Sequence, residues 1–143
     1  MKKIVMLVCA SFMLFGCGSK EEKEMEGVGT NTNDSGETTT AKVTFKGNKI
    51  DEVDIDETAK GKDTTKKELK DAYNMKQASP IKKEWYQQVE FFEDYVEKNG
   101  IDKIKLNADG KAENDDVKSG CTISVDGFIK AIEAAKKNAT EED

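Results

Sequence analysis

One change of composition limits how much of the chain can build a hydrophobic core. Residues 18–40 contain no aromatic side chain, and their only large apolar residues are Met25 and Val28. A segment of this kind buries too little apolar surface to offset the entropy that it loses on ordering. We therefore expect residues 17–40 to form a disordered tether of about 25–30 Å root-mean-square length. Residues 41–140 are expected to form the folded domain.

The first 17 residues combine two lysines, a short apolar run and a cysteine. The apolar run, residues 4–15, is shorter than the ~20 residues that span a bilayer as a helix, and the pattern is typical of a secretory signal peptide. The sequence LFGC at 14–17 is similar to a lipobox, although its phenylalanine is bulkier than the usual small residue. We expect a signal peptide over residues 1–16 and a lipid on Cys17 that anchors the protein to the outer face of the cell membrane. The alternative is a plain signal peptide with an incidental cysteine.

Histidine and arginine are absent, so all 23 basic residues are lysines, and the formal net charge is -6. Without histidine, Ser-His-Asp and Cys-His catalysis and the usual imidazole metal sites are excluded. The acidic charge and the lack of guanidinium groups disfavour nucleic acid as a partner. Cleavage of the signal peptide would leave only Cys17 and Cys121, so we expect no internal disulfide. We also expect that the protein is not an enzyme.

The folded part opens with two local signals. Apolar and polar residues alternate over residues 42–46 and again over 51–56, on either side of the dipeptide Gly-Asn at 47–48. This pattern predicts a β-hairpin with a two-residue turn. Thr65 followed by Glu68 has the sequence of a capping box, which predicts a short helix at this point.

A long helix is predicted in the middle of the domain. Ser79 is a favourable N-cap, Pro80 fits the first turn, and Gly100 fits the position after the last turn. Apolar residues at helical spacing form one stripe between these ends. They are Trp85, Val89, Phe92 and Val96, with Phe91 and Tyr95 at the margins. We expect this stripe to lie in the core.

Two further elements complete the expected fold. Ile104 and Leu106 suggest another strand, and Ser124 is a favourable cap for a last helix. The apolar face of that helix would comprise Val125, Phe128, Ile129 and Ile132. The predicted fold class is α+β: a small single domain with an N-terminal β-hairpin, a long central helix and a C-terminal helix.

Acidic and amide residues between positions 107 and 116 match several ligand positions of a calcium-binding EF-hand loop. The register, however, places Lys105 at the first ligand position and an aspartate where a bidentate glutamate is required. We therefore reject a metal site here and predict a solvated acidic loop with a turn at Asp109-Gly110.

Residues 116–122 read DVKSGCT and precede the last predicted helix. A tight Ser-Gly turn at this place would present backbone N–H groups and a helix N-terminus, which together favour a phosphate. The Thr122 hydroxyl could accept a phosphoryl group there. The alternative is a turn in which the hydroxyls of this segment merely cap the helix.

This stretch resembles the flavinylation motif Asp-x-x-Ser-Gly-Ala-Thr/Ser of bacterial FMN-binding domains, with Cys121 in place of the usual alanine. Such domains occur in subunits of sodium-pumping NADH:quinone reductases and in surface lipoproteins of extracellular electron transfer. Residues 43–57, 68–85 and 122–134 also look like the repeat of pheromone-precursor lipoproteins. The resemblance covers nearly all of residues 41–137.

The resemblance implies a function and a set of site residues. A transferase that uses FAD and a divalent cation would place FMN on Thr122 through its phosphate. The flavin would then carry electrons between a membrane donor and an extracellular acceptor. The residues implied to hold the cofactor or to shape its site are Thr122, Cys121, Gly120, Ser119, Asp116, Met75, Ser79 and Trp85, of which Trp85 also fits a core role. The alternative is a non-flavinylated binding or structural lipoprotein of the pheromone-precursor type.

Overall fold

The structure, a computed structural model, describes residues 22–141. This part of the chain begins with a three-stranded meander. The strands are β1 (Glu24–Thr32), β2 (Thr38–Lys46), β3 (Lys49–Glu57) and β4 (Thr140–Glu141). The helices are α1 (Lys66–Leu69), the 3-10 turn η1 (Lys70–Tyr73), α2 (Trp85–Asn99), α3 (Asp115–Lys118) and α4 (Asp126–Asn138). The signal peptide predicted over residues 1–16 and the lipidation predicted at Cys17 lie outside the described residues. Among the helices that are described, none has the length and apolar character needed to cross a membrane.

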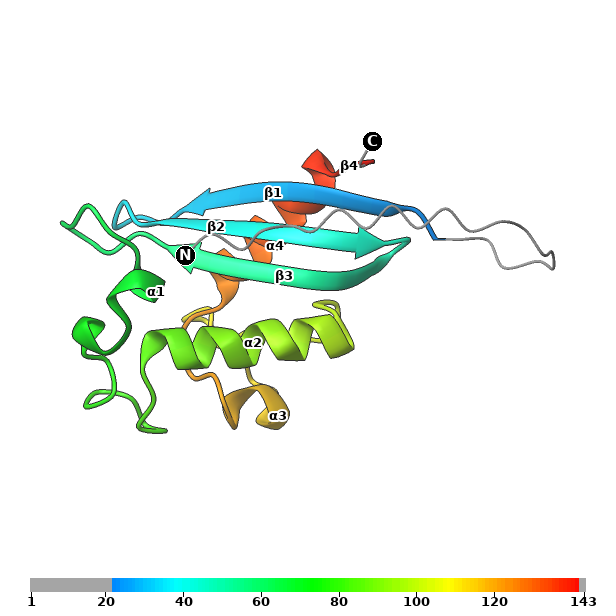
Figure 1. The fold of residues 1–143 in the computed structure, drawn as a ribbon. Coiled ribbons are helices and arrows are strands. Elements are labelled where there is room, and N and C mark those ends of the chain that lie inside the picture. Colours follow the sequence, from blue (N-terminus) through cyan, green and yellow to red (C-terminus); the bar gives the residue numbers. More distant parts are fainter. Residues whose placement is uncertain (1–21, 142–143) are drawn as a thin grey trace.

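The strands form one antiparallel sheet in the order β3-β2-β1-β4 (Figure 1). The predicted β-hairpin is confirmed as β2 and β3, which are joined by the two-residue turn at 47–48. Gly47 has a φ of 58°, a left-handed conformation that tight hairpin turns require. Val43 lies opposite Val53, so the apolar residues of both strands face the same side of the sheet.

The N-terminal boundary of the domain differs from the prediction. Residues 24–40 were expected in a disordered tether, but they form β1, the turn after it and the beginning of β2, so this part of the prediction is wrong. β1 pairs with β2 along its whole length. Ordering β1 costs conformational entropy, and burial of its few apolar side chains is too small to offset this cost. The backbone hydrogen bonds to β2 help to offset it. The domain therefore begins near Glu24 and not at Ala41.

Two glycines explain how β1 joins the sheet with so few apolar side chains. Gly27 and Gly29 face α4, and a Cβ on Gly29 would lie 2.0 Å from the carbonyl oxygen of Ala131. The helix can approach this closely only because glycine has no side chain. The low hydrophobicity of β1 is therefore a requirement of close helix packing and not a sign of disorder.

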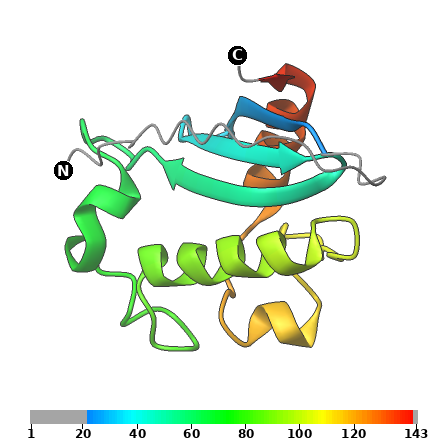
Figure 2. The same cartoon turned by 45° about the vertical axis from the view of Figure 1, so that its right-hand side comes forward.

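Helices α2 and α4 cover one face of the sheet. α4 packs on β1 and β2, whereas α2 packs on β3 (Figures 1 and 2). Strand residues on the opposite face, such as Thr30, Thr40 and Glu52, are exposed. This two-layer arrangement confirms the α+β class, the long central helix and the C-terminal helix of the prediction.

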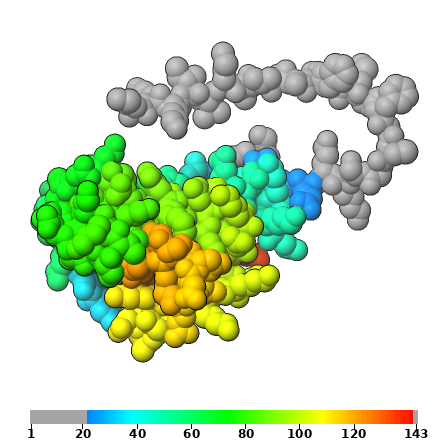
Figure 3. Space-filling model, turned by 90° about the horizontal axis from the view of Figure 1, so that it is seen from below, coloured from blue at the N-terminus to red at the C-terminus, as the bar shows by residue number. Residues whose placement is uncertain are grey.

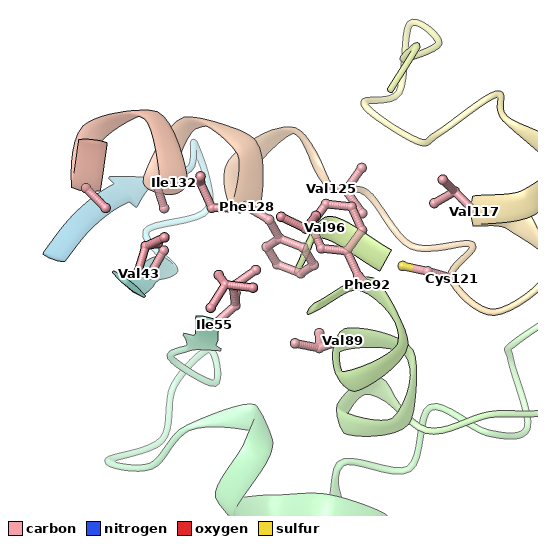
Figure 4. Close-up of a cluster of buried hydrophobic side chains, with 14 of the residues drawn as sticks. Val43, Ile55, Val89, Phe92, Val96, Val117, Cys121, Val125, Phe128 and Ile132 are labelled. Atoms are coloured by element: carbon pink, nitrogen blue, oxygen red, sulfur yellow. The ribbon is translucent and has the colours of Figure 1, made fainter. Parts of the chain in front are cut away.

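The core lies between the sheet and the two helices (Figure 4). Phe128 of α4 connects the helices, because its ring centroid lies 5.9 Å from that of Trp85 and 5.7 Å from that of Phe92. Both partners come from the apolar stripe predicted for α2. Burial of each such side chain contributes about 1.5–3 kcal/mol to folding.

The long helix begins later than predicted. Its N-cap is Glu84, which forms a capping box with Gln87, so the prediction of a start at Ser79-Pro80 is wrong. The Ser79 hydroxyl instead accepts hydrogen bonds from the Ile81 N–H and from the side chain of Gln88. It is therefore engaged within the loop before α2. The C-terminal end is as predicted, since Gly100 follows the last turn with a φ of 73°.

Of three local predictions outside the long helix, the structure confirms one and contradicts two. The capping box of Thr65 and Glu68 at α1 is confirmed. The strand predicted at 104–106 is wrong, because Leu106 forms only an isolated bridge with Ala112 across the turn at 107–110. Ser124 is also not the cap of α4. Its hydroxyl lies 3.3 Å from the carbonyl oxygen of Gly110 and donates to it.

The outer edge of β3 is occupied by side chains of α2. The Val53 N–H donates to a carboxylate oxygen of Glu97 (3.1 Å), and the Ile55 N–H donates to a carboxylate oxygen of Glu93 (2.7 Å). The helix thus contacts β3 both through the core and along its free edge.

Candidate functional site

A cavity of about 560 Å³ lies where β1 turns into β2. Its walls come from the turn at 31–39, the loop at 75–80, the beginning of α2 and the segment at 122–130. Four residues that the sequence assigned to the cofactor site line it, namely Met75, Ser79, Trp85 and Thr122. Its volume falls within the range of about 300–1,000 Å³ that is usual for small-molecule sites.

A second, larger hollow of about 1010 Å³ lies at the other end of the strands, between the β2–β3 turn and the ends of α2 and α4. None of the predicted site residues lines it. Of these two hollows, only the first is therefore lined by predicted site residues.

The two polar residues at the start of the predicted motif lie at the surface, outside the cavity. Asp116 is exposed and accepts the N–H of the following residue, Val117. Desolvation and a hydrogen bond with Asp116 raise the pKa of the Tyr95 hydroxyl on α2. Ser119 is exposed, and its hydroxyl donates to the carbonyl oxygen of Asp116 (2.7 Å). Both residues therefore shape the short helix α3 and are accessible to another protein.

The middle of the motif is packed against α2. Gly120 is buried against the ring of Phe91, with which any Cβ at this position would collide. Figure 3 shows the segment around 115–122 and the region of α1 and α2 lying against each other on one face of the molecule. The turn that precedes Thr122 is thus fixed by packing.

Cys121 belongs to the core and not to the cavity. Its side chain is fully buried, and Figure 4 shows its sulfur directed toward Phe92. Burial raises the pKa of its thiol to about 12. A thiol of this kind is not a nucleophile at neutral pH, so the cysteine fills the place of the usual alanine as a small apolar residue.

The predicted phosphate site at a helix N-terminus is not formed. Thr122 lies between α3 and α4, four residues before the first residue of α4, Asp126. Its N–H donates to Oε1 of Gln88 on α2 (2.9 Å), and its hydroxyl Oγ1 lies 3.3 Å from the same oxygen. The backbone of this segment is therefore held by a side chain of the long helix.

Gln88 is the site residue that sequence reasoning missed. It is fully buried, and its Nε2 lies 3.2 Å from the Ser79 hydroxyl, 3.1 Å from the carbonyl oxygen of Lys83 and 3.7 Å from the sulfur of Met75. One amide thus connects three residues of the predicted site, Met75, Ser79 and Thr122. A signal was present: position 88 falls within the apolar stripe of α2, where a polar side chain needs buried partners.

The loop before α2 is held by a second buried polar group. The carboxylate of Glu84 accepts the Met75 N–H (2.8 Å) and the Lys76 N–H (3.2 Å). Trp85 is only 2% exposed and packs edge-on against Phe128. Its role in the core is therefore shown, while one side of it lines the cavity.

A buried cation lies in the cavity wall. Lys66 is 5% exposed and forms ion pairs with Glu37 and Glu57. Burial alone would lower the pKa of Lys66, but its hydrogen bonds and charge attraction to the two carboxylates outweigh this and raise the pKa. Its ammonium also lies 5.6 Å from the ring centroid of Trp85 and 5.4 Å from that of Tyr73, within cation–π range.

Comparison with known proteins adds no relative: no protein-family model, no curated protein and no solved structure matches this chain. The resemblance to FMN-binding domains therefore depends on the motif at 116–122 and on the segments named with it.

Proposed function

We propose that this protein is an electron carrier that holds FMN covalently on Thr122 through a phosphoester. The observation that supports the proposal best is the cavity. Met75, Ser79 and Trp85 come from the loop and helix start at 75–85, Thr122 lies about 40 residues later, and these four residues, which the resemblance assigned to one site, line one hollow of about 560 Å³.

The residues of the cavity fit a flavin chemically. An aromatic ring (Trp85), a thioether (Met75) and a hydroxyl group (Ser79) line the cavity and combine apolar contact with hydrogen bonding, as an isoalloxazine requires. When bound, the flavin would supply redox chemistry that none of these side chains can perform. The protein would hold the ring, limit its contact with water and set the charge around it.

The position of the motif also fits modification by another protein. Asp116 and Ser119 are exposed, so a transferase can contact them, while Thr122 is partly buried at the cavity wall. The thiol of Cys121 is buried in the core, so the hydroxyl of Thr122 is the attachment point that we propose.

The decisive experiment is co-expression with an FMN transferase, followed by intact-mass measurement. The protein should become yellow, gain one FMN less one water, and keep its fluorescence after denaturation. Thr122→Ala should abolish the mass gain, Thr122→Ser should keep part of it, and Cys121→Ala should label as wild type does. Failure of the wild type to label beside a labelled control acceptor would disprove the proposal. Labelling that survives Thr122→Ala but not Cys121→Ala would indicate a thioether instead.

One observation favours the alternative of a non-flavinylated binding or structural lipoprotein. Both the N–H and the hydroxyl of Thr122 have a hydrogen-bond partner, Gln88, without any ligand. Thr122 would then serve only to hold its segment on α2. The labelling experiment separates the two proposals.

We further propose that a lipid on Cys17 anchors the domain to the outer face of the cell membrane. Support comes from the sequence at 14–17. Cys17→Ala should leave uncleaved precursor or release the protein from the membrane fraction. A variant that is processed and partitions into detergent like wild type would contradict the anchor.

A further inference from the structure

Gln88 is the buried polar group with the most connections to the proposed attachment site. Every hydrogen-bonding atom of its amide has a partner, and these partners lie on both sides of the cavity wall: Thr122 on one side and the Met75–Lys83 loop on the other. Its own side chain is fully buried, so water cannot replace these partners.

The partners themselves fix the orientation of the amide. The Thr122 N–H can only donate, so the atom that faces it must be the amide oxygen. The carbonyl oxygen of Lys83 can only accept, so the atom that faces it must be the amide nitrogen. The oxygen is therefore held toward Thr122 by the network and cannot exchange places with the nitrogen without breaking a hydrogen bond at each end.

We propose that Gln88 is a positioning residue for flavin attachment: its Oε1 accepts both the N–H and the hydroxyl hydrogen of Thr122 and thereby aims the Oγ1 lone pairs into the cavity. This inference rests on the proposed function. The N–H hydrogen bond holds the backbone of Thr122, the hydroxyl hydrogen bond holds its side-chain rotamer, and the hydroxyl that donates to Gln88 presents its lone pairs away from the helix. A reacting group held in one orientation gains rate in the way that any pre-oriented nucleophile does.

The chemistry of flavin attachment explains why a hydrogen-bond acceptor suits the position beside Thr122. Oγ1 attacks the FMN-side phosphorus of FAD, so one O–P bond forms and one P–O bond of the pyrophosphate breaks. AMP leaves with the bonding electron pair, and the hydroxyl turns its hydrogen from Gln88 toward a base of the transferase, which takes the proton. As the proton leaves, the Thr122 N–H still donates to Gln88, so the segment stays in place when the hydroxyl hydrogen bond is lost.

Three variants of the full-length protein separate positioning from mere stability. Gln88→Met keeps the shape of the side chain but removes its acceptor. Gln88→Glu, protonated in this buried site, keeps an acceptor oxygen toward Thr122. Val96→Ala removes buried methyl groups from the far end of α2, away from the cavity, and serves as a stability control, and Gln77→Met is an exposed control for the change to methionine.

Labelling by an FMN transferase with FAD and Mg²⁺ is followed by intact mass, and folding is followed by thermal melting. We expect Gln88→Met to lower kcat for labelling roughly tenfold with KM for the acceptor unchanged, because Asp116 and Ser119 remain exposed. Gln88→Glu should recover most of the rate. Val96→Ala should label within about twofold of wild type even though it melts earlier, and Gln77→Met should match wild type in both measurements.

Two results would overturn the role of Gln88. One is labelling of Gln88→Met at the wild-type rate. The other is a loss of labelling in Gln88→Met, Gln88→Glu and Val96→Ala that follows only their loss of folded protein. If Gln88→Met does not fold, Gln88→Asn takes its place: it keeps an amide but is one methylene shorter, so its oxygen no longer reaches Thr122, and labelling of folded Gln88→Asn at the wild-type rate would overturn the role. If wild type is not labelled beside a working control acceptor, the proposed function fails, and this inference fails with it.

Discussion

The backbone of Gly120 lies directly against the ring of Phe91: a Cβ at Gly120 would come within 2.3 Å of the ring carbons. Gly120→Ala must therefore displace the ring or the turn that leads to Thr122, and it should destabilise the protein by about 1–3 kcal/mol. Urea unfolding measures this loss. Combination with Phe91→Ala should cost less than the sum of the single changes, because it removes the collision. Strict additivity of the two changes would show that the contact is unimportant.

The thiol of Cys121 should be inert in the folded protein. Burial raises its pKa to about 12, and only the thiolate reacts with alkylating agents. Iodoacetamide should therefore leave Cys121 of the native protein unmodified from pH 7 to about pH 10 and modify it rapidly in denaturant. Mass spectrometry after timed exposure gives the answer. Rapid native modification at pH 8 would mean that the side chain is not in the core.

Loss of the buried cation in the cavity wall should be costly. Lys66→Met leaves Glu37 and Glu57 close together without their shared counter-ion, and removal of one partner of a buried ion pair costs about 3–5 kcal/mol. The pKa of Lys66 is raised in the folded state. Its contribution to the free energy of unfolding is therefore complete below the ordinary pKa of lysine and is lost as the pH rises through the higher pKa of the folded state. Wild type should thus lose stability in the alkaline range. Lys46→Met, which breaks only the exposed pair with Asp51, should change little. Equal effects of the two changes would refute the argument.

The domain should depend on β1. A chain that starts at Ala41 lacks this strand, so it leaves an edge of β2 unpaired and uncovers the face of α4 that packs on Gly27 and Gly29. We expect such a chain to aggregate or to lose its cooperative melting, whereas a chain that starts at Glu22 should melt like the full-length protein. Circular dichroism of both chains tests this. A stable domain starting at Ala41 would restore the tether that the sequence suggested.

Elements with strong local signals were predicted correctly. The hairpin turn at 47–48, the capping box at Thr65 and the end of α2 before Gly100 each depend on a few neighbouring residues. The apolar stripe of α2 and most of that of α4 were also correct, because periodicity reports which face is buried.

Elements that depend on distant partners were missed. β1 looked disordered because Gly27 and Gly29 make room for a helix that lies about a hundred residues further along the chain. Ser79 looked like a helix cap because its true partner, the Gln88 amide, becomes visible only in the folded chain. For the candidate site, the motif identified Thr122 from sequence, and the place of Gln88 in the apolar stripe of α2 indicated a need for buried partners without indicating that Thr122 would be one of them.

The two glutamates along β3 affect how readily copies of this protein can associate through the edges of their sheets. Glu93 and Glu97 are one helical turn apart, a rise of about 6 Å, which is close to the spacing of two residues in a strand; that match lets one helix reach alternate N–H groups at Val53 and Ile55. Because the N–H groups of Val53 and Ile55 are already bound, β3 is a poorer edge for pairing with a strand from a neighbouring copy. The occupied edge of β3 thus disfavours self-association. This would limit aggregation of many copies held close together on one surface.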